Sequence, residues 1–109
     1  MNLKRIANHD EMVPMKFRLS QNYPNPFTVK TKIKYCVACK TKVKINVYTP
    51  EGKLVENLLD DVKCEGTYEI EFNAYTNKSQ SSRSLSEGNY FYTMEATNFI
   101  DRKVMTIKK

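Results

Sequence analysis

The segment that decides the fold runs Phe17-Arg18-Leu19-Ser20-Gln21-Asn22-Tyr23-Pro24-Asn25-Pro26-Phe27. Its Pro-Asn-Pro triplet cannot lie inside a helix, because each proline fixes φ at about −65° and lacks a backbone N–H donor. Each proline also drives the residue before it, Tyr23 or Asn25, toward extended geometry. We therefore predict a rigid, extended corner that opens a β-domain, with the rings of Tyr23 and Phe27 pinning it against the core.

After the corner, apolar and polar residues alternate with a period of two. Strict alternation is typical of strands that bury one face. We predict strands over residues 30–37, 42–47, 53–59, 67–72, 88–96 and 99–108. The short gap between the first two of these, Ala38–Lys40, predicts that they form a hairpin-like pair.

Turn residues separate the predicted strands. Thr49-Pro50-Glu51-Gly52 is a turn, because proline presets φ at its second position and glycine accepts a positive φ. Glu65-Gly66 and Thr97-Asn98 mark two further turns. Serine and asparagine dominate Asn73–Glu87 and cannot support a core, so we predict a mobile loop there.

These elements together predict an all-β fold, an immunoglobulin-like antiparallel β-sandwich of about seven strands. The two inner faces would be supplied by the apolar residues of the alternating stretches. We expect the inward residues to be Ile33, Tyr35, Val43, Ile45, Val47, Val55, Tyr68, Ile70, Phe72, Tyr90, Tyr92 and Ile107.

Length and composition indicate one domain. The chain has 109 residues, and residues 1–16 are weakly patterned, so we divide it into a flexible leader or linker remnant (1–16) and a β-domain (17–109). The sequence contains no apolar run long enough for a transmembrane helix and no N-terminal secretory signal. If the chain is exported, we expect it in the periplasm, outer membrane or cell surface; a native start at Met1 would place it in the cytoplasm.

Three cysteines, Cys36, Cys39 and Cys64, form an odd set that does not suit a closed disulfide framework. A zinc site needs four ligands, and the single histidine, His9, lies far upstream of Cys36-x-x-Cys39. A thioredoxin-like motif lies at a helix N-terminus, whereas Cys36 ends a strand pattern. We favour the interpretation that these cysteines are simply small residues at a strand end and a turn. The three cysteines are weak metal candidates, and we expect no cofactor.

Lysines occupy alternate positions of the first two predicted strands. If these strands pair, Lys32, Lys34, Lys42 and Lys44 share one basic face. Such a face could bind an anionic surface such as lipopolysaccharide, an acidic protein surface or phosphate. We favour the alternative, a solvated face whose lysines discourage edge-to-edge association. Since no nucleic-acid-binding motif accompanies the net charge of +6, we expect no nucleic-acid partner.

The aromatic stretch of the chain predicts mostly core. Tyr90 and Tyr92 share one face of their strand, whereas Phe91 points the other way and could form an exposed patch with Tyr48.

Catalytic residues lack the neighbours that they would need. His9 lies in the leader, and adjacent carboxylates on a turn, Asp60 and Asp61, point apart and do not make an acid–base pair. The serines of the long loop have no base near them in sequence. We therefore predict that the chain is not an enzyme.

A series of ordered motifs runs along the domain. In chain order these are Phe17 to Phe27, Thr31-x-Ile33-x-Tyr35, Val43-x-Ile45-x-Val47-Tyr48-x-x-x-Gly52-x-x-Val55, Gly66-Thr67-Tyr68, Ser86-Glu87-Gly88-Asn89-Tyr90-Phe91-Tyr92 and Lys103-Val104-Met105-Thr106-Ile107-x-Lys109. From Phe17 to Lys109 the chain resembles the type A C-terminal sorting domain of the type IX (Por) secretion system. The signature residues of this resemblance are Asn22, Tyr23, Pro24, Asn25, Pro26, Phe27, Gly52, Gly88 and Tyr90.

The chain departs from the family pattern at three places. Val37-Ala38 stands where the family usually has Leu-Pro, Phe72-Asn73-Ala74 stands where it often has a Trp-Asp-Gly turn, and the late loop is serine-rich. A short leader also precedes the domain, where the family normally has a large cargo.

The resemblance implies a non-catalytic sorting and interaction domain, read by the type IX machinery, that directs export and surface attachment. It places recognition at the closing strand, on Lys103, Val104, Met105, Ile107 and Lys109, which as an edge strand could add to a partner's sheet. Two alternatives remain at this point: a free-standing accessory subunit that stabilises a larger, possibly membrane-bound, assembly, and a thiol or metal module built on the cysteines.

Overall fold

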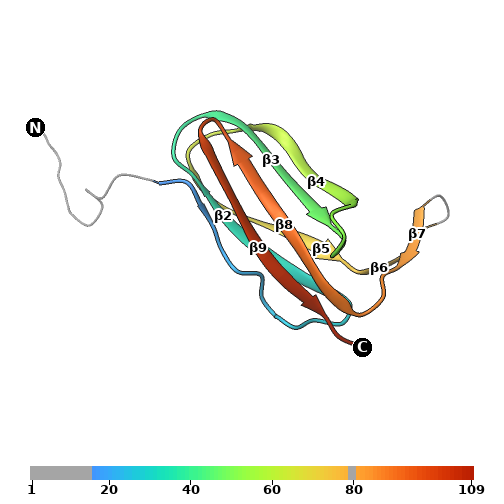
Figure 1. Ribbon diagram of the computed structural model, residues 1–109. Coiled ribbons are helices and arrows are strands. Elements are labelled where there is room, and N and C mark those ends of the chain that lie inside the picture. The colour runs from blue at the N-terminus through green and yellow to red at the C-terminus, as the bar shows by residue number, and fades with distance from the viewer. Residues whose placement is uncertain (1–15, 79–80) are drawn as a thin grey trace, which may run out of the picture.

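Two antiparallel sheets face each other and a small hairpin extends from one end, as the computed structural model shows for residues 16–78 and 81–109 (Figure 1). The three-stranded sheet has the order β1-β2-β5, the four-stranded sheet has the order β4-β3-β8-β9, and β6 pairs with β7. The strands are β1 (Arg18–Leu19), β2 (Lys30–Val37), β3 (Thr41–Tyr48), β4 (Leu54–Lys63), β5 (Gly66–Asn73), β6 (Tyr75–Lys78), β7 (Ser81–Ser84), β8 (Gly88–Ala96) and β9 (Phe99–Ile107). The prediction of an all-β sandwich is confirmed.

The core lies between the two sheets and follows the predicted alternation. Of the twelve residues expected to point inward, nine are buried, and Val55, Tyr68 and Ile70 are partly buried against the core. The alternation is clearest in β2 and in residues 43–47 of β3, where every second side chain is buried and the side chains between are exposed or half-buried. Further buried core residues are Leu19, Phe27, Val37, Ala74, Met94, Ala96 and Met105.

The predicted pairing of β2 with β3 is wrong. β2 pairs with β5 over eight residue pairs, among them Ile33 with Ile70, whereas β3 pairs with β4 and β8 in the other sheet. The bend at residues 38–40 therefore crosses from one sheet to the facing sheet. Alternation shows which face of a strand is buried. Two strands give the same pattern whether they are neighbours in one sheet or lie in facing sheets, so the pattern does not show which strands pair.

The predicted loop at Asn73–Glu87 contains a hairpin. Strands β6 and β7 pair antiparallel from Tyr75 opposite Ser84 to Lys78 opposite Ser81, and the hairpin projects from one end of the sandwich (Figure 1). Its strands belong to neither of the two sheets that enclose the core. The polar composition did not predict these two strands, because a hairpin outside the two sheets forms its backbone pairs without a hydrophobic pattern.

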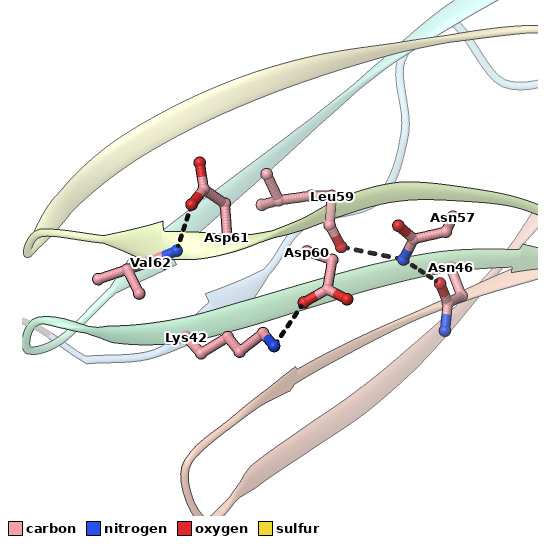
Figure 2. Close-up of polar contacts among 7 residues, drawn as sticks. All are labelled: Lys42, Asn46, Asn57, Leu59, Asp60, Asp61 and Val62. Atoms are coloured by element: carbon pink, nitrogen blue, oxygen red, sulfur yellow. Dashed lines mark hydrogen bonds and ion pairs between the residues drawn. The ribbon is translucent and has the colours of Figure 1, made fainter.

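Strand β4 lies at an edge and contains two irregularities in register. The pairing moves from Ile45–Leu59 to Asn46–Asn57, which leaves Leu58 as an extra residue. The Asn57 side chain bridges this bulge, because its Nδ2 donates to Asn46 Oδ1 at 2.6 Å and to the Leu59 carbonyl at 3.1 Å (Figure 2). A bulge re-aims the side chains beside it, and Leu58 is partly buried against the core.

Arg83 of β7 joins the two sheets at one end of the sandwich. Its Nη2 donates to Glu56 Oε1 of β4 and to the Asn73 carbonyl of β5, both at 2.6 Å. Its guanidinium also lies 5.0 Å from the centre of the Phe72 ring. The arginine side chain is only 24% exposed, so this ion pair is shielded from water more than the lysine pairs on the outer faces.

Two tight turns have the predicted form. Gly52 has φ of +94°, and its N–H donates to the Thr49 carbonyl at 2.9 Å, as expected for the Pro50-containing turn. Thr97 adopts φ of +47° in the turn that joins β8 to β9.

The difference in burial between two ion pairs of β4 predicts different effects on stability. We expect Arg83→Gln to lower the free energy of unfolding by about 1–3 kcal/mol, because it removes a charged hydrogen bond and leaves Glu56 half-buried. Lys42→Gln removes the 3.3 Å pair with Asp60, whose lysine is 65% exposed, and should cost less than about 0.5 kcal/mol. Urea unfolding of both variants measures the difference, and equal losses would contradict the assignment of Arg83 as the joining residue.

Candidate functional site

The N-terminal segment 18–28, which contains the corner, runs along one edge of both sheets. It first pairs with β2, where Tyr23 and Lys32 exchange N–H···O bonds of 2.9 and 3.0 Å. It then reaches β9, where the Phe27 N–H donates to the Thr106 carbonyl at 3.0 Å and the Lys108 N–H donates to the Phe27 carbonyl at 2.9 Å. In Figure 1 this blue segment passes beside the red strand β9. The corner therefore closes one side of the sandwich.

Side chains of the same segment bond further backbone groups of β9. Asn25 Oδ1 accepts from the Thr106 N–H at 2.9 Å, and Gln21 Nε2 donates to the Val104 carbonyl at 2.6 Å. These groups lie on the edge of β9 that faces away from β8, as the backbone bonds of Thr106 to Phe27 show. The outer edge of the closing strand is thus occupied in its C-terminal half.

A small buried polar network fixes the corner on the three-stranded sheet. Asn22 and Thr31 are 2% and 1% exposed, and Asn22 Nδ2 donates to Thr31 Oγ1 at 3.0 Å. Both side chains also donate to the Pro24 carbonyl, at 3.2 and 2.8 Å, and Gln21 Nε2 donates to Asn22 Oδ1 at 2.7 Å. Buried polar groups that are satisfied in this way favour one geometry over all others.

Two aromatic residues anchor the corner from inside. Phe27 is 4% exposed and packs edge-on against Phe72, with ring centres 6.3 Å apart. The fully buried Tyr92 of β8 donates its hydroxyl to the Ser20 carbonyl at 2.6 Å. Burial raises the pKa of Tyr92 above its ordinary value of 10.0. The prediction that Phe27 pins the corner to the core is confirmed.

The corresponding prediction for Tyr23 is wrong, since its side chain is 81% exposed. Tyr23 lies directly opposite Lys32, which points to the outer face of β2. Directly paired residues of neighbouring strands present their side chains on the same face of a sheet. The register of the corner on β2 therefore directs the Tyr23 ring to solvent.

The predicted recognition residues of the closing strand divide between core and surface. Met105 and Ile107 are buried in the core, whereas Val104 and Lys109 are exposed and Lys103 is half-buried. As predicted, β9 is an edge strand. Addition of a partner strand along its C-terminal half would require displacement of the corner, because the corner already bonds that edge.

The remaining signature residues lie where β8 begins and in the Pro50 turn. Tyr90 is buried and donates its hydroxyl to the Ser86 carbonyl at 3.0 Å. Gly88 has φ of +157°, and Pro50 lies 3.8 Å from the position where its Cβ would stand. These residues shape the end of the sandwich where the hairpin leaves it.

The predicted basic face is also wrong. Lys32 and Lys34 lie on the outer face of β2, and Lys42 and Lys44 lie on the outer face of β3, which belongs to the opposite sheet. Acidic neighbours accompany these lysines, for example Glu69 at 3.7 Å from Lys32. On the other sheet, Asp60 lies 3.3 Å from Lys42 (Figure 2). Each sheet thus has a mixed outer face.

The cysteines do not assemble a ligand set in the described part of the chain. Cys36 is half-buried with its Sγ 3.5 Å from Thr67 Oγ1, and Cys39 and Cys64 are exposed. Within residues 16–78 and 81–109, no group of three or more His, Cys, Asp or Glu side chains could hold a metal ion. His9 lies outside the described residues.

Tyr48 and Phe91, the pair predicted to form an exposed patch, lie next to each other on the outer face of the four-stranded sheet. Tyr48 and Phe91 stack with ring centres 5.0 Å apart, and Arg102 lies 4.9 Å from the Phe91 ring. Both aromatic side chains are only half-exposed. The stack therefore supports the pairing of β3 with β8 at least as much as it offers a surface.

Over residues 21–108, the sequence matches the family described as the secretion system C-terminal sorting domain. The chain belongs to this family. The matched range begins within segment 18–28 and ends one residue past β9, so it includes most of that segment and the whole closing strand. No curated protein and no solved structure matches the chain, and the immunoglobulin-like connectivity stays a prediction.

Thr31, the partner of Asn22 in the sorting domain, was not predicted from the sequence. Thr31 shares the inward phase of Ile33 and Tyr35, and it is buried with them. A polar residue at an inward position was the available signal, because buried hydroxyls need a hydrogen-bonding partner.

No helix that is long and apolar enough to cross a membrane occurs in the part of the chain that the structure describes.

The packing of Phe27 predicts a large cost for its truncation. We expect Phe27→Ala to lower the free energy of unfolding by about 3–5 kcal/mol, as for other buried phenylalanines. The nearby Val29→Ala is the matched control, since Val29 is 50% exposed and should cost less than about 1 kcal/mol. Chemical unfolding measures both, and a small effect of Phe27→Ala would show that the corner is not anchored through this ring.

The raised pKa of Tyr92 predicts a loss of stability at alkaline pH. The tyrosine of the unfolded chain ionises near pH 10, whereas burial keeps the folded one protonated, so its contribution is complete below pH 10 and declines above it. Tyr92→Phe should cost about 0.5–1.5 kcal/mol at pH 7 through the lost bond to Ser20. Above pH 10 the free energy of unfolding of Tyr92→Phe should fall less steeply with pH than that of the wild type. The two slopes should differ by up to about 1.4 kcal/mol per pH unit.

Unfolding curves of the wild type and of Tyr92→Phe at several pH values test this prediction. Parallel decline of the two proteins above pH 10 would contradict it.

Proposed function

We propose that this domain is a non-catalytic C-terminal sorting domain that directs export and surface attachment of its polypeptide through type IX secretion. The observation that carries the proposal is the family match over residues 21–108, which runs from the corner to the closing strand. Sorting tails of this family occur on exported proteins destined for the cell surface or outer membrane. The partner that the family implies is the secretion machinery itself.

The geometry of the adjacent carboxylates Asp60 and Asp61 supports a non-catalytic role. Asp60 pairs with Lys42, whereas Asp61 accepts a hydrogen bond from the Val62 N–H at 2.8 Å (Figure 2). The two carboxylates thus face different partners and do not converge on one point. No observation favours the accessory-subunit alternative.

An export assay tests the proposal. The chain is fused behind a secreted reporter that carries a signal peptide, in a bacterium with an active type IX system. We expect the reporter at the cell surface, and we expect it in the periplasm when residues 103–109 are deleted, because that deletion removes the partners of the corner.

A sorting domain that the host already exports serves as the positive control. Surface display of that control without display of this chain would contradict the proposed function.

A further inference from the structure

Tyr23 displays a large aromatic ring that the fold does not use. Its 81% exposure is the highest among the exposed large hydrophobic residues of the described chain, and the next is Ile100 at 74%. An exposed aromatic ring gains little from folding, whereas tyrosine is among the residues that most often dominate binding at protein interfaces.

The backbone on both sides of this ring is fixed. Tyr23 exchanges two backbone hydrogen bonds with Lys32, the preceding Asn22 is buried, and the carbonyl of Pro24 accepts bonds from Asn22 and Thr31. The ring is thus held out from a frame that is already ordered. A partner that binds it need not order the segment that carries it, which lowers the entropic cost of association.

A shallow hollow lies beside the ring. It has a volume of about 370 Å³ and a mainly apolar lining made by Tyr23, Pro24, Lys30, Thr31, Lys32 and Glu71. A hollow of this kind accepts an apolar side chain of a partner next to the tyrosine ring.

Two lysines at the rim of the hollow are loosely paired. Lys30 lies 3.8 Å from Glu71 and Lys32 lies 3.7 Å from Glu69, and the lysine side chains are 63% and 58% exposed. Exposed ion pairs of this geometry contribute little to stability. A partner's carboxylates can therefore take the place of Glu71 and Glu69 beside the two lysines. The net charge of +6 favours an acidic partner by long-range attraction.

We propose that Tyr23 and this hollow form the docking surface for an acidic protein segment of the secretion machinery. The inference rests on the proposed function and adds which surface is read. An apolar side chain of the segment fills the hollow against Tyr23, and its carboxylates pair with Lys30 and Lys32. Docking uses side chains and not strand addition, because the corner already bonds the edge of β2 beside the hollow.

The test compares matched variants of the full chain in the export assay. Tyr23→Ala and the double variant Lys30→Gln/Lys32→Gln should each reduce surface display about tenfold or more. Tyr75→Ala, which removes another exposed tyrosine, and Lys42→Gln/Lys44→Gln, on the opposite sheet, should keep wild-type display. Thermal unfolding of each purified variant should stay within about 5 °C of the wild type, as expected for surface positions.

Each other outcome overturns a defined statement. Wild-type display by Tyr23→Ala, or a larger fall in its unfolding temperature, contradicts the docking surface, whereas failure of the unchanged chain to be displayed contradicts the proposed function. Vesicles that contain the host's lipopolysaccharide are the second probe. If the wild type binds them and Tyr23→Ala does not, the surface takes a glycolipid and the protein partner is wrong.

Discussion

The structure depends on one segment, the corner, whose backbone pairs with β2 of one sheet and with β9 of the other. Two packed sheets leave open edges with unpaired backbone groups, which proteins must cover or protect. Here a single segment covers an edge of each sheet, and Phe27 and Leu19 fill the space behind it. The proline-rich sequence suits this place, since a segment that crosses between sheets cannot continue the ladder of either one.

Other edges of the sandwich are protected by individual side chains. Arg83 joins β4 to the end of β5, and Asp61 and Asp101 each accept a hydrogen bond from the N–H of the next residue on the two edge strands of the four-stranded sheet. Both of these aspartate hydrogen bonds join neighbouring residues of the same strand. Such local bonds reduce the tendency of an edge strand to recruit another chain.

The sequence allowed the buried faces to be predicted well, because alternation with a period of two depends only on which side of a strand meets the core. It did not determine which strands are neighbours, so β2 and β3 were paired wrongly and Lys32 and Lys42 were placed on one face. The orientation of Tyr23 depends on the register between the corner and β2, and register arises from long-range pairing that a local pattern does not encode.

The bonds between the corner and β9 join residues about eighty positions apart in the chain, such as Asn25 and Thr106. A ribosome makes the corner long before it makes its partner, so this side of the sandwich can form only after the last strand is available. A polypeptide that ends before Thr106 would leave Asn25 and Phe27 without their backbone partners. This side of the sandwich is therefore completed only once the chain has been made as far as Lys108.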